Sequence, residues 1–124
     1  MNIIVNFETA KFLKDVKGFE PESKAFYDGS GELFYYSYSN NVMQRFRYAA
    51  PTIAEVVMWL YEKYGIWIEC NHCGTFNEFT FKVSKLNKKN RKKEPHYMHD
   101  FGKGFNSPTE AYEAAILYCL TNLI

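Results

Sequence analysis

Two pairs of side chains in this chain have spacings that could hold a metal ion. Cys70 and Cys73 are separated by two residues, and so are His96 and His99. Two cysteines and two histidines can complete a tetrahedral structural zinc site. A hairpin closed at residues 85–93, however, would place Cys73 about eight residues from the position facing His99, or roughly 26 Å at about 3.3 Å per residue. We therefore predict a polar turn at the cysteines, unrelated strand histidines, and no metal or other cofactor.

The cysteines could also serve as nucleophiles. His72 adjoins Cys73 in the sequence, but a reactive thiolate needs an oriented base, a third group that orients the base, and an oxyanion site. The sequence contains no signature for these groups. We predict no catalytic residues and a protein that is not an enzyme.

A basic segment covers residues 85–93. Its cations are Lys85, Lys88, Lys89, Arg91, Lys92 and Lys93, and the rest of the chain has nine Lys and Arg against 14 Asp and Glu. Clustered cations can neutralise phosphates and release counterions from nucleic acid. The segment has no aromatic residue for base stacking, and the acidic remainder opposes broad contact with a duplex. Two interpretations of the segment therefore stay open: a solvated hairpin tip and a nucleic-acid-binding loop.

Aromatic residues alternate along the segment 33–48. The expected core face carries Phe34, Tyr36, Tyr38, Phe46 and Tyr48. The other face carries Tyr35, Arg45 and Arg47, which could bind a partner protein or a small anionic ligand by stacking and charge. The alternative is a solvated sheet face with arginine stems lying over a tyrosine.

The first half of the chain predicts a helix and a group of strands. Apolar spacing favours a helix over residues 8–17 that ends at Gly18. Turn residues at 28–31 predict a hairpin over 24–38, and a second turn leads into a strand over 43–48. If this strand pairs with the preceding one, shared faces require Tyr36 to oppose Phe46 and Phe34 to oppose Tyr48.

The second half predicts a helix on each side of another strand group. Thr52 and Glu55 form a capping box for a helix that ends at Gly65, and Ser107 and Glu110 form a second box for the final helix. The expected strands cover residues 66–70, 79–83 and 96–101, with a turn at 71–74. Met58 and Trp59 fall outside the narrow apolar stripe of their helix, so they either widen its buried face or mark a contact surface.

These elements predict an α+β fold in which two hairpin groups form an antiparallel sheet, with three helices packed mainly on one face. A length of 124 residues and 47% apolar residues suit a single domain spanning 1–124. No window is long and apolar enough to span a membrane, and three cysteines imply no disulfide framework. We expect a cytoplasmic protein.

Several segments together resemble a known family. They are Ala50-Pro51-Thr52, Trp59-Leu60, Tyr64-Gly65-Ile66-Trp67-Ile68-Glu69, Phe105-Asn106-Ser107, Glu110-Ala111 and Ala114-Ala115-Ile116. With these segments the chain, from residue 7 to 124, resembles a family of small proteins of unknown function from phages and prophages of Bacteroides-type gut bacteria. The resemblance implies a phage-related protein in the cytoplasm of a bacterial host, and it supplies no active site.

Two hypotheses for function follow. The first is a noncatalytic binding module for a host protein or small ligand, with a role in countering host defence, that uses Tyr35, Arg45 and Arg47. The alternative is a nucleic-acid-binding accessory protein that uses the basic loop 85–93.

Overall fold

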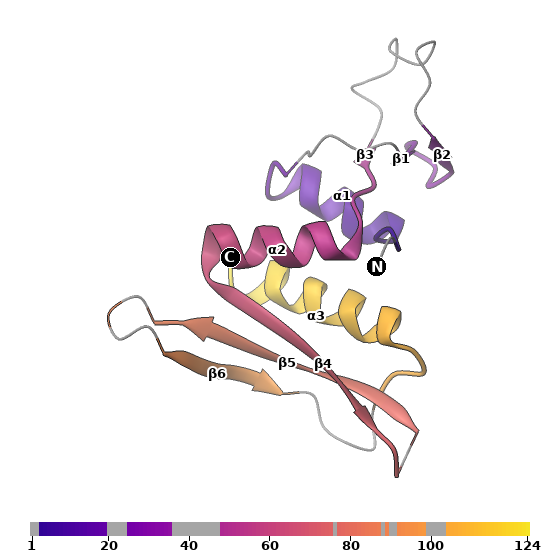
Figure 1. The fold of residues 1–124 in the computed structure, drawn as a ribbon. Helices are drawn as coiled ribbons and strands as arrows, with labels where there is room; N and C mark the ends of the chain where they lie inside the picture. Colours follow the sequence, from indigo (N-terminus) through magenta and orange to yellow (C-terminus); the bar gives the residue numbers. More distant parts are fainter. Residues whose placement is uncertain are drawn as a thin grey trace. The chain divides into compact units, whose positions relative to one another are not determined.

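The computed structural model describes residues 3–19, 25–35, 48–75, 77–87, 89, 92–98 and 104–124 (Figure 1). Its elements, in chain order, are α1 (Phe7–Asp15), β1 (Ala25–Tyr27), β2 (Leu33–Tyr35), β3 (Tyr48–Ala49), α2 (Ile53–Tyr64), β4 (Ile66–Cys73), β5 (Glu78–Leu86), β6 (Lys93–Met98) and α3 (Pro108–Asn122). All strand pairs are antiparallel, and the strands form two separate three-stranded sheets. The fold is α+β, as predicted, and each hairpin group forms a sheet of its own. The chain divides into two compact units, Met1–Ile53 and Ala54–Ile124.

The first unit begins with α1, whose two ends are fixed by local hydrogen bonds. The Asn6 side chain caps the helix by accepting from the backbone N–H of Thr9 at 2.9 Å. Gly18 has φ +66°, and the N–H of Phe19 donates to the carbonyl of Leu13. The chain therefore reverses at Gly18, as its conformational freedom predicts.

The sheet of the first unit has the strand order β2-β1-β3. The predicted hairpin is present, with Phe26 opposite Phe34. Helix α1 packs on the sheet through the Phe7 ring, which makes edge contacts with Tyr27 and Tyr48 at centroid distances of 5.6 and 5.8 Å. The Tyr27 hydroxyl donates to the Val5 carbonyl at 2.7 Å, so the one polar atom of this buried ring is satisfied.

The predicted pairing of Phe34 with Tyr48 is wrong. Strand β3 pairs with β1, which places Tyr48 opposite Tyr27, whereas Phe34 lies opposite Phe26. Since directly opposed residues share a face and neighbours along a strand alternate, Phe34 and Tyr48 lie on opposite faces. The prediction failed because it paired strands that follow one another in sequence, and β1 separates them in the sheet. The expected pair of Tyr36 with Phe46 lies outside the described residues.

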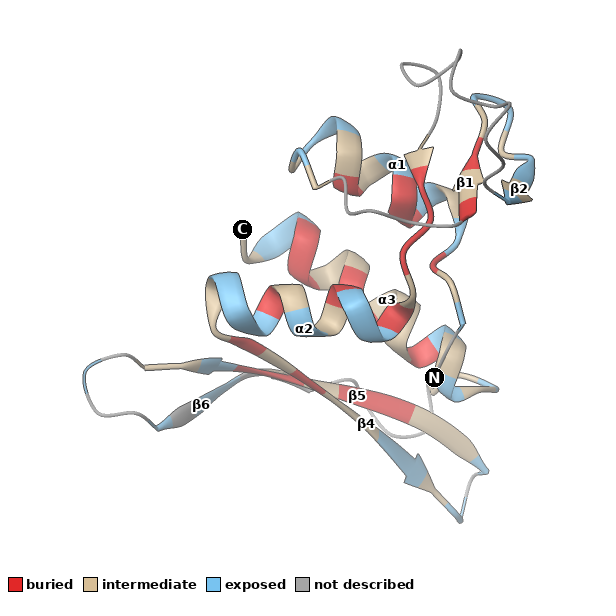
Figure 2. Cartoon of the chain, turned by 45° about the horizontal axis from the view of Figure 1, so that its top comes forward, coloured by how far each residue is buried: buried red, intermediate tan, exposed pale blue. Residues whose placement is uncertain are grey.

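In the second unit, β5 is the central strand of the sheet, and α2 and α3 lie on the same side of it (Figures 1 and 2). Side chains that alternate along β4 and β5 are buried beneath the helices: Ile66, Ile68, Phe81 and Val83. Helix α3 packs against both strands, and its buried face combines small residues with larger ones: Ala111, Ala115, Ile116, Cys119 and Leu120. The small side chains allow the helix to lie close to the sheet.

An aromatic cluster joins α3 to the sheet. The Tyr118 ring stacks on Tyr97 of β6 at a centroid distance of 4.3 Å, and Phe81 of β5 lies 5.5 Å from Tyr97. Phe105 stacks on Phe81 at 6.2 Å, and its backbone pairs with Phe79. These contacts anchor the segment that leads into α3.

Helix α2 ends, and helix α3 begins, at the residues that the sequence predicts. Gly65, with φ +68°, terminates α2, and its carbonyl accepts from the N–H of Leu86. Ser107 caps α3 by accepting from the N–H of Glu110, and the Glu110 carboxylate accepts from the N–H of Asn106. The predicted Ser107 cap is therefore confirmed, whereas the Glu110 side chain bonds to the residue before the cap rather than to the N–H of Ser107.

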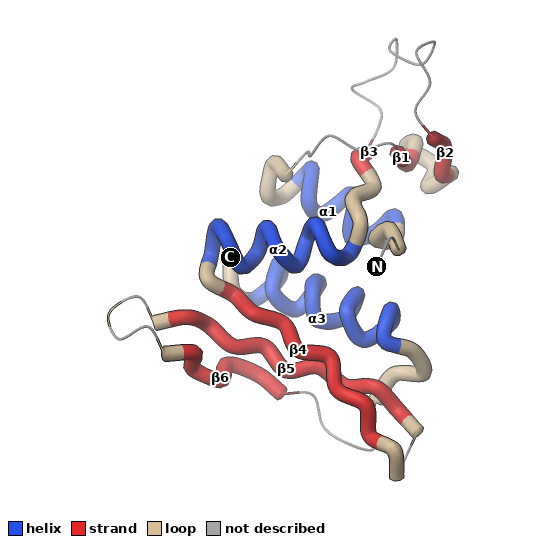
Figure 3. Tube along the Cα trace, in the orientation of Figure 1, coloured by secondary structure: helices blue, strands red, loops and turns tan. Residues whose placement is uncertain are grey.

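Strand bounds in the second sheet differ from the sequence prediction (Figure 3). Strand β4 continues to Cys73, so the turn begins at Gly74 rather than at residue 71. Strand β6 begins at Lys93, so the ends of the basic segment belong to strands and the connection between them is short. Cross-strand pairing of Leu86 with Lys93 extends both strands into the charged segment, which apolar alternation alone does not indicate.

Candidate functional site

Of the predicted partner-binding residues, Tyr35 is the one that the structure describes. Its side chain is 68% exposed, and Leu33, two residues earlier on β2, is 38% exposed. The spacing places both side chains on one face of the strand. Arg45 and Arg47, the other predicted residues of this surface, lie outside the described residues. We call Leu33 and Tyr35 the β2 surface.

The β2 surface lies at the edge of the sheet, beside side chains of β1 that are buried. Leu33 and Tyr35 are opposite Tyr27 and Ala25 of β1 and therefore share their face. Tyr27 and Ala25 are buried, and Phe7 of α1 contacts the Tyr27 ring. Strand β2 is the outermost strand on that side, and its two side chains are exposed where those of β1 are buried.

The turn before β2 is held by one carboxylate. Asp28 accepts hydrogen bonds from the N–H and hydroxyl of Ser30, at 2.9 and 2.7 Å, and from the N–H of Glu32 at 3.0 Å. These hydrogen bonds to Ser30 and Glu32 lower the pKa of Asp28, because they favour the charged carboxylate. Gly31, with φ +89°, completes the turn against the Phe7 ring. The turn thus fixes where β2 begins.

The basic segment forms the tip of the β5–β6 hairpin. Asn87 closes the tip: its N–H donates to the Lys92 carbonyl, its side-chain oxygen accepts from the N–H of Lys89, and its side-chain amide donates to Glu94 at 3.0 Å. The predicted nucleic-acid-binding residues Lys85, Lys89 and Lys92 are exposed. Lys93 belongs to β6, with only its backbone described, and Lys88 and Arg91 lie outside the described residues.

The two cysteines whose spacing could suit a zinc site do not face each other. Cys70 and Cys73 are three residues apart on one strand, so their side chains point to opposite faces of the sheet. His96 is the extra residue of β6 at the irregularity beside Val83 and Ser84, about 10 Å from β4 across two strand spacings. His99 lies outside the described residues. In the ranges that the structure describes, no group of three His, Cys, Asp or Glu could hold a metal ion.

Burial makes Cys70 and Cys119 poor nucleophiles. Desolvation raises the pKa of Cys70, and it raises the pKa of Cys119 to about 12. The pKa of Tyr112 is also raised, by burial and by its proximity to the charge of Cys70. His72, two residues from Cys70, has its Nε2 3.4 Å from the side-chain oxygen of Asn77 and packs on Phe79. None of these contacts activates a thiol.

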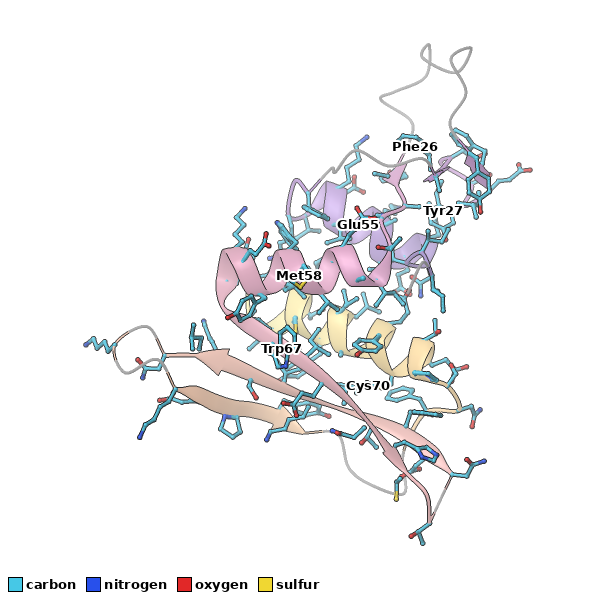
Figure 4. The ribbon with its side chains drawn as sticks, viewed as in Figure 1. Phe26, Tyr27, Glu55, Met58, Trp67 and Cys70 are labelled. Carbon is cyan, nitrogen blue, oxygen red and sulfur yellow. The ribbon has the colours of Figure 1, made fainter. Side chains whose placement is uncertain are left out.

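Helix α2 carries an exposed apolar surface that the sequence predicted only in part. Met58 and Tyr61 are 45% and 41% exposed, and Tyr61 makes an edge contact with Trp67 at 5.5 Å. Figure 4 labels Met58 on α2 and Trp67 at the start of β4. The sequence pattern indicated Met58 and Trp59 as possible contact residues. It did not indicate Tyr61, which lies three residues after Met58 and therefore on the same side of the helix. Trp59 is half-buried.

Comparison of the chain with protein-family models, with curated proteins and with solved structures gave no match. Among the described residues, no helix has both the length and the apolar character needed to cross a membrane.

Proposed function

We propose that this protein is a noncatalytic module that binds a host protein through the β2 surface. The observation that carries the proposal is the exposure of Tyr35 beside Leu33 on an edge strand. Tyrosine is enriched where proteins bind one another, because it offers a large contact area and loses little conformational freedom. The phage-related cytoplasmic setting and a role in countering host defence complete the proposal, and they rest on the family resemblance.

Capture from a lysate of a Bacteroides-type host tests this function. Wild-type protein and the Tyr35→Lys variant are immobilised at equal density, and retained proteins are quantified by mass spectrometry. Tyr61→Lys is the matched control, since Tyr61 is an exposed aromatic residue of the other unit. We expect a protein that wild type and Tyr61→Lys retain and Tyr35→Lys loses. Equal retention by all three proteins would contradict the proposal.

A second candidate function is nucleic-acid binding by the hairpin tip, as an accessory protein. The observation that favours it is the ordered turn at Asn87, which holds exposed Lys85, Lys89 and Lys92 at one end of the hairpin. Held cations can contact successive phosphates of a polyanion. A small anionic ligand would instead involve Arg45 and Arg47.

A salt titration of binding to DNA and RNA tests this second function. Replacing Lys85, Lys89 and Lys92 together by Ser should lower the affinity and reduce the slope of log affinity against log salt by up to about 3, since each phosphate contact contributes roughly 0.9. Replacing the same residues by Arg preserves the charge and should preserve the slope. An unchanged slope in the Ser variant would exclude the tip as the binding element.

A further inference from the structure

The backbone of the β2 surface faces away from its own sheet. Asp28 donates its N–H to the carbonyl of Glu32, which makes this a hydrogen-bonded pair. Hydrogen-bonded and non-hydrogen-bonded pairs alternate along an antiparallel ladder. Phe34 therefore bonds to β1, whereas Leu33 and Tyr35 occupy the non-hydrogen-bonded positions. Their N–H and C=O groups point outward, along the edge where their side chains are exposed.

The other sheet edges in the described part of the chain present different residues at their outward positions. On β3 the outward residue is Ala49, which is buried. On β4 the outward residues Ile66 and Ile68 are buried, and those further along are the smaller or polar Cys70 and His72. On β6 Pro95 occupies an outward position, beside an irregularity in the register. Proline has no N–H to offer and a bulge twists an edge away, so both block strand addition.

Strand β2 has neither the proline nor the register irregularity of β6. Leu33-Phe34-Tyr35 contains no proline and no charge, and apolar edge strands of this kind accept further strands. The sequence is also nearly symmetric about Phe34. In an antiparallel self-pairing centred there, Leu33 of each copy faces Tyr35 of the other. The N–H and C=O groups of both residues point outward. Leu33 of one copy and Tyr35 of the other can therefore form a hydrogen-bonded pair in this register.

We propose that β2 pairs antiparallel with β2 of a second copy of this chain, which joins the two sheets into one of six strands. The twofold axis passes beside Phe34, as closed symmetry requires. Each Leu33 side chain packs against Tyr35 of the second copy, and such aromatic–aliphatic pairs stabilise neighbouring strands. The pairing brings no like charges together within the strand.

This pairing rests on the proposed function, since it takes the β2 surface as a protein contact. The proposed pairing adds two points to that function. The β2 surface binds through its backbone, and a second copy of the chain can be the partner. A host protein that adds a strand at β2 would use the same backbone groups. Self-association and host binding would therefore compete. The short strand buries far less than the roughly 800 Å² per partner of a standard interface, so the dimer is weak and reversible.

Sedimentation velocity between about 10 µM and 1 mM, the range of weak association, tests the pairing. We expect the wild-type protein to shift from monomer to dimer over this range. Tyr35→Lys should weaken the association by about tenfold or more, because a lysine on an edge strand opposes strand addition. Tyr35→Phe keeps the ring and should dimerise like the wild type. Thermal unfolding of each variant confirms that the exposed position tolerates the change.

Amide hydrogen exchange provides the backbone test. The amides of Leu33 and Tyr35 should exchange faster than that of Phe34 in dilute protein and should slow as concentration rises. A wild-type protein that stays monomeric up to 1 mM would overturn the pairing, as would equal dimerisation of Tyr35→Lys. Such results would leave host binding intact, because the lysate comparison measures host binding in dilute, immobilised protein.

Discussion

At the scale of single residues, Asp28 couples the first hairpin to pH. Its folded-state pKa lies below the value of 3.8 expected without its hydrogen bonds. A lowered folded-state pKa means that the charged form stabilises the fold. This contribution is fully present above the unfolded-state pKa and is lost as pH falls through the folded-state pKa. The hairpin that presents the β2 surface is therefore weakened by acid.

Asp28→Asn tests this coupling. The amide oxygen can still accept hydrogen bonds, but it has no charge, so the variant should melt at a lower temperature than the wild type at pH 7. The difference should shrink as pH falls from about 5 to 2, where the wild-type carboxyl becomes neutral. Thermal midpoints measured across this range check the expectation. A difference that stays constant with pH would show that the charge is not responsible.

Cys119 should be chemically inert in the folded protein. It is buried, with a pKa raised to about 12 against 9.0 without burial, and the thiolate is the reactive form. At pH 8 the loss of thiolate alone should slow alkylation roughly thousandfold relative to the unfolded chain. Iodoacetamide labelling with peptide mass spectrometry measures the rate, with Cys73 as the internal reference. Labelling of Cys119 at the rate of Cys73 would contradict its burial.

At the scale of elements, a carboxylate of β5 holds the backbone of the segment that leads into α3. Glu78 accepts from the N–H of Gly104 at 2.9 Å. A Cβ at Gly104 would lie 2.7 Å from the carboxyl carbon of Glu78. The glycine therefore allows the carboxylate to approach the backbone.

Gly104→Ala should displace this carboxylate and cost about 1 kcal/mol, the usual net value of a hydrogen bond. In a Glu78→Ala background the same substitution should cost little, because nothing remains to displace. A double-mutant cycle by denaturant unfolding measures the coupling. Equal costs in both backgrounds would mean that Gly104 matters for another reason.

Elements whose signals are local could be predicted from the sequence. The caps at Ser107 and Gly18 and the hairpin turn at Asp28 depend on partners a few residues away. The partner of β3 could not be predicted. Its residue Tyr48 pairs with Tyr27 of β1, and β2 lies between these two strands in the sequence. Alternation alone fixes which side chains share a face only after the neighbouring strand is known.

The candidate site was predictable to the same extent. Exposure of the lysines follows from charge. Exposure of Tyr35 follows from the edge position of β2, because strand alternation places Tyr35 on the face of buried Tyr27 and Ala25. The outward direction of the Tyr35 backbone depends on the hydrogen-bonding phase with β1, which the local turn from Asp28 to Glu32 sets. The separation of Cys70 and Cys73 onto opposite faces depends on β4 continuing to Cys73.

At the scale of the whole molecule, a single domain is expected to unfold in one cooperative transition. The boundary between the two units falls between Ile53 and Ala54, within the first turn of α2. The N–H of Ile53 donates to the Ile3 carbonyl, so the first unit holds the start of this helix. Helices lose stability cooperatively when an end is released. We therefore expect both units to unfold together.

The two tryptophans provide the measurement. Trp59 and Trp67 belong to the second unit, so their fluorescence reports its unfolding, whereas far-ultraviolet circular dichroism reports both units. The two denaturation curves should coincide. Separate midpoints would show two independently folding domains.

The closed hairpin tip also makes the chain suitable for splitting. Lys89 and Lys92 are exposed at a turn between two paired strands, where trypsin would find its preferred side chains. A cut there leaves β6 and α3 in one fragment and β4 and β5 in the other, and the contacts of α3 with β4 and β5 span the break. The two pieces should elute together from a sizing column, which makes the tip a place to divide the gene and reassemble the protein from its halves.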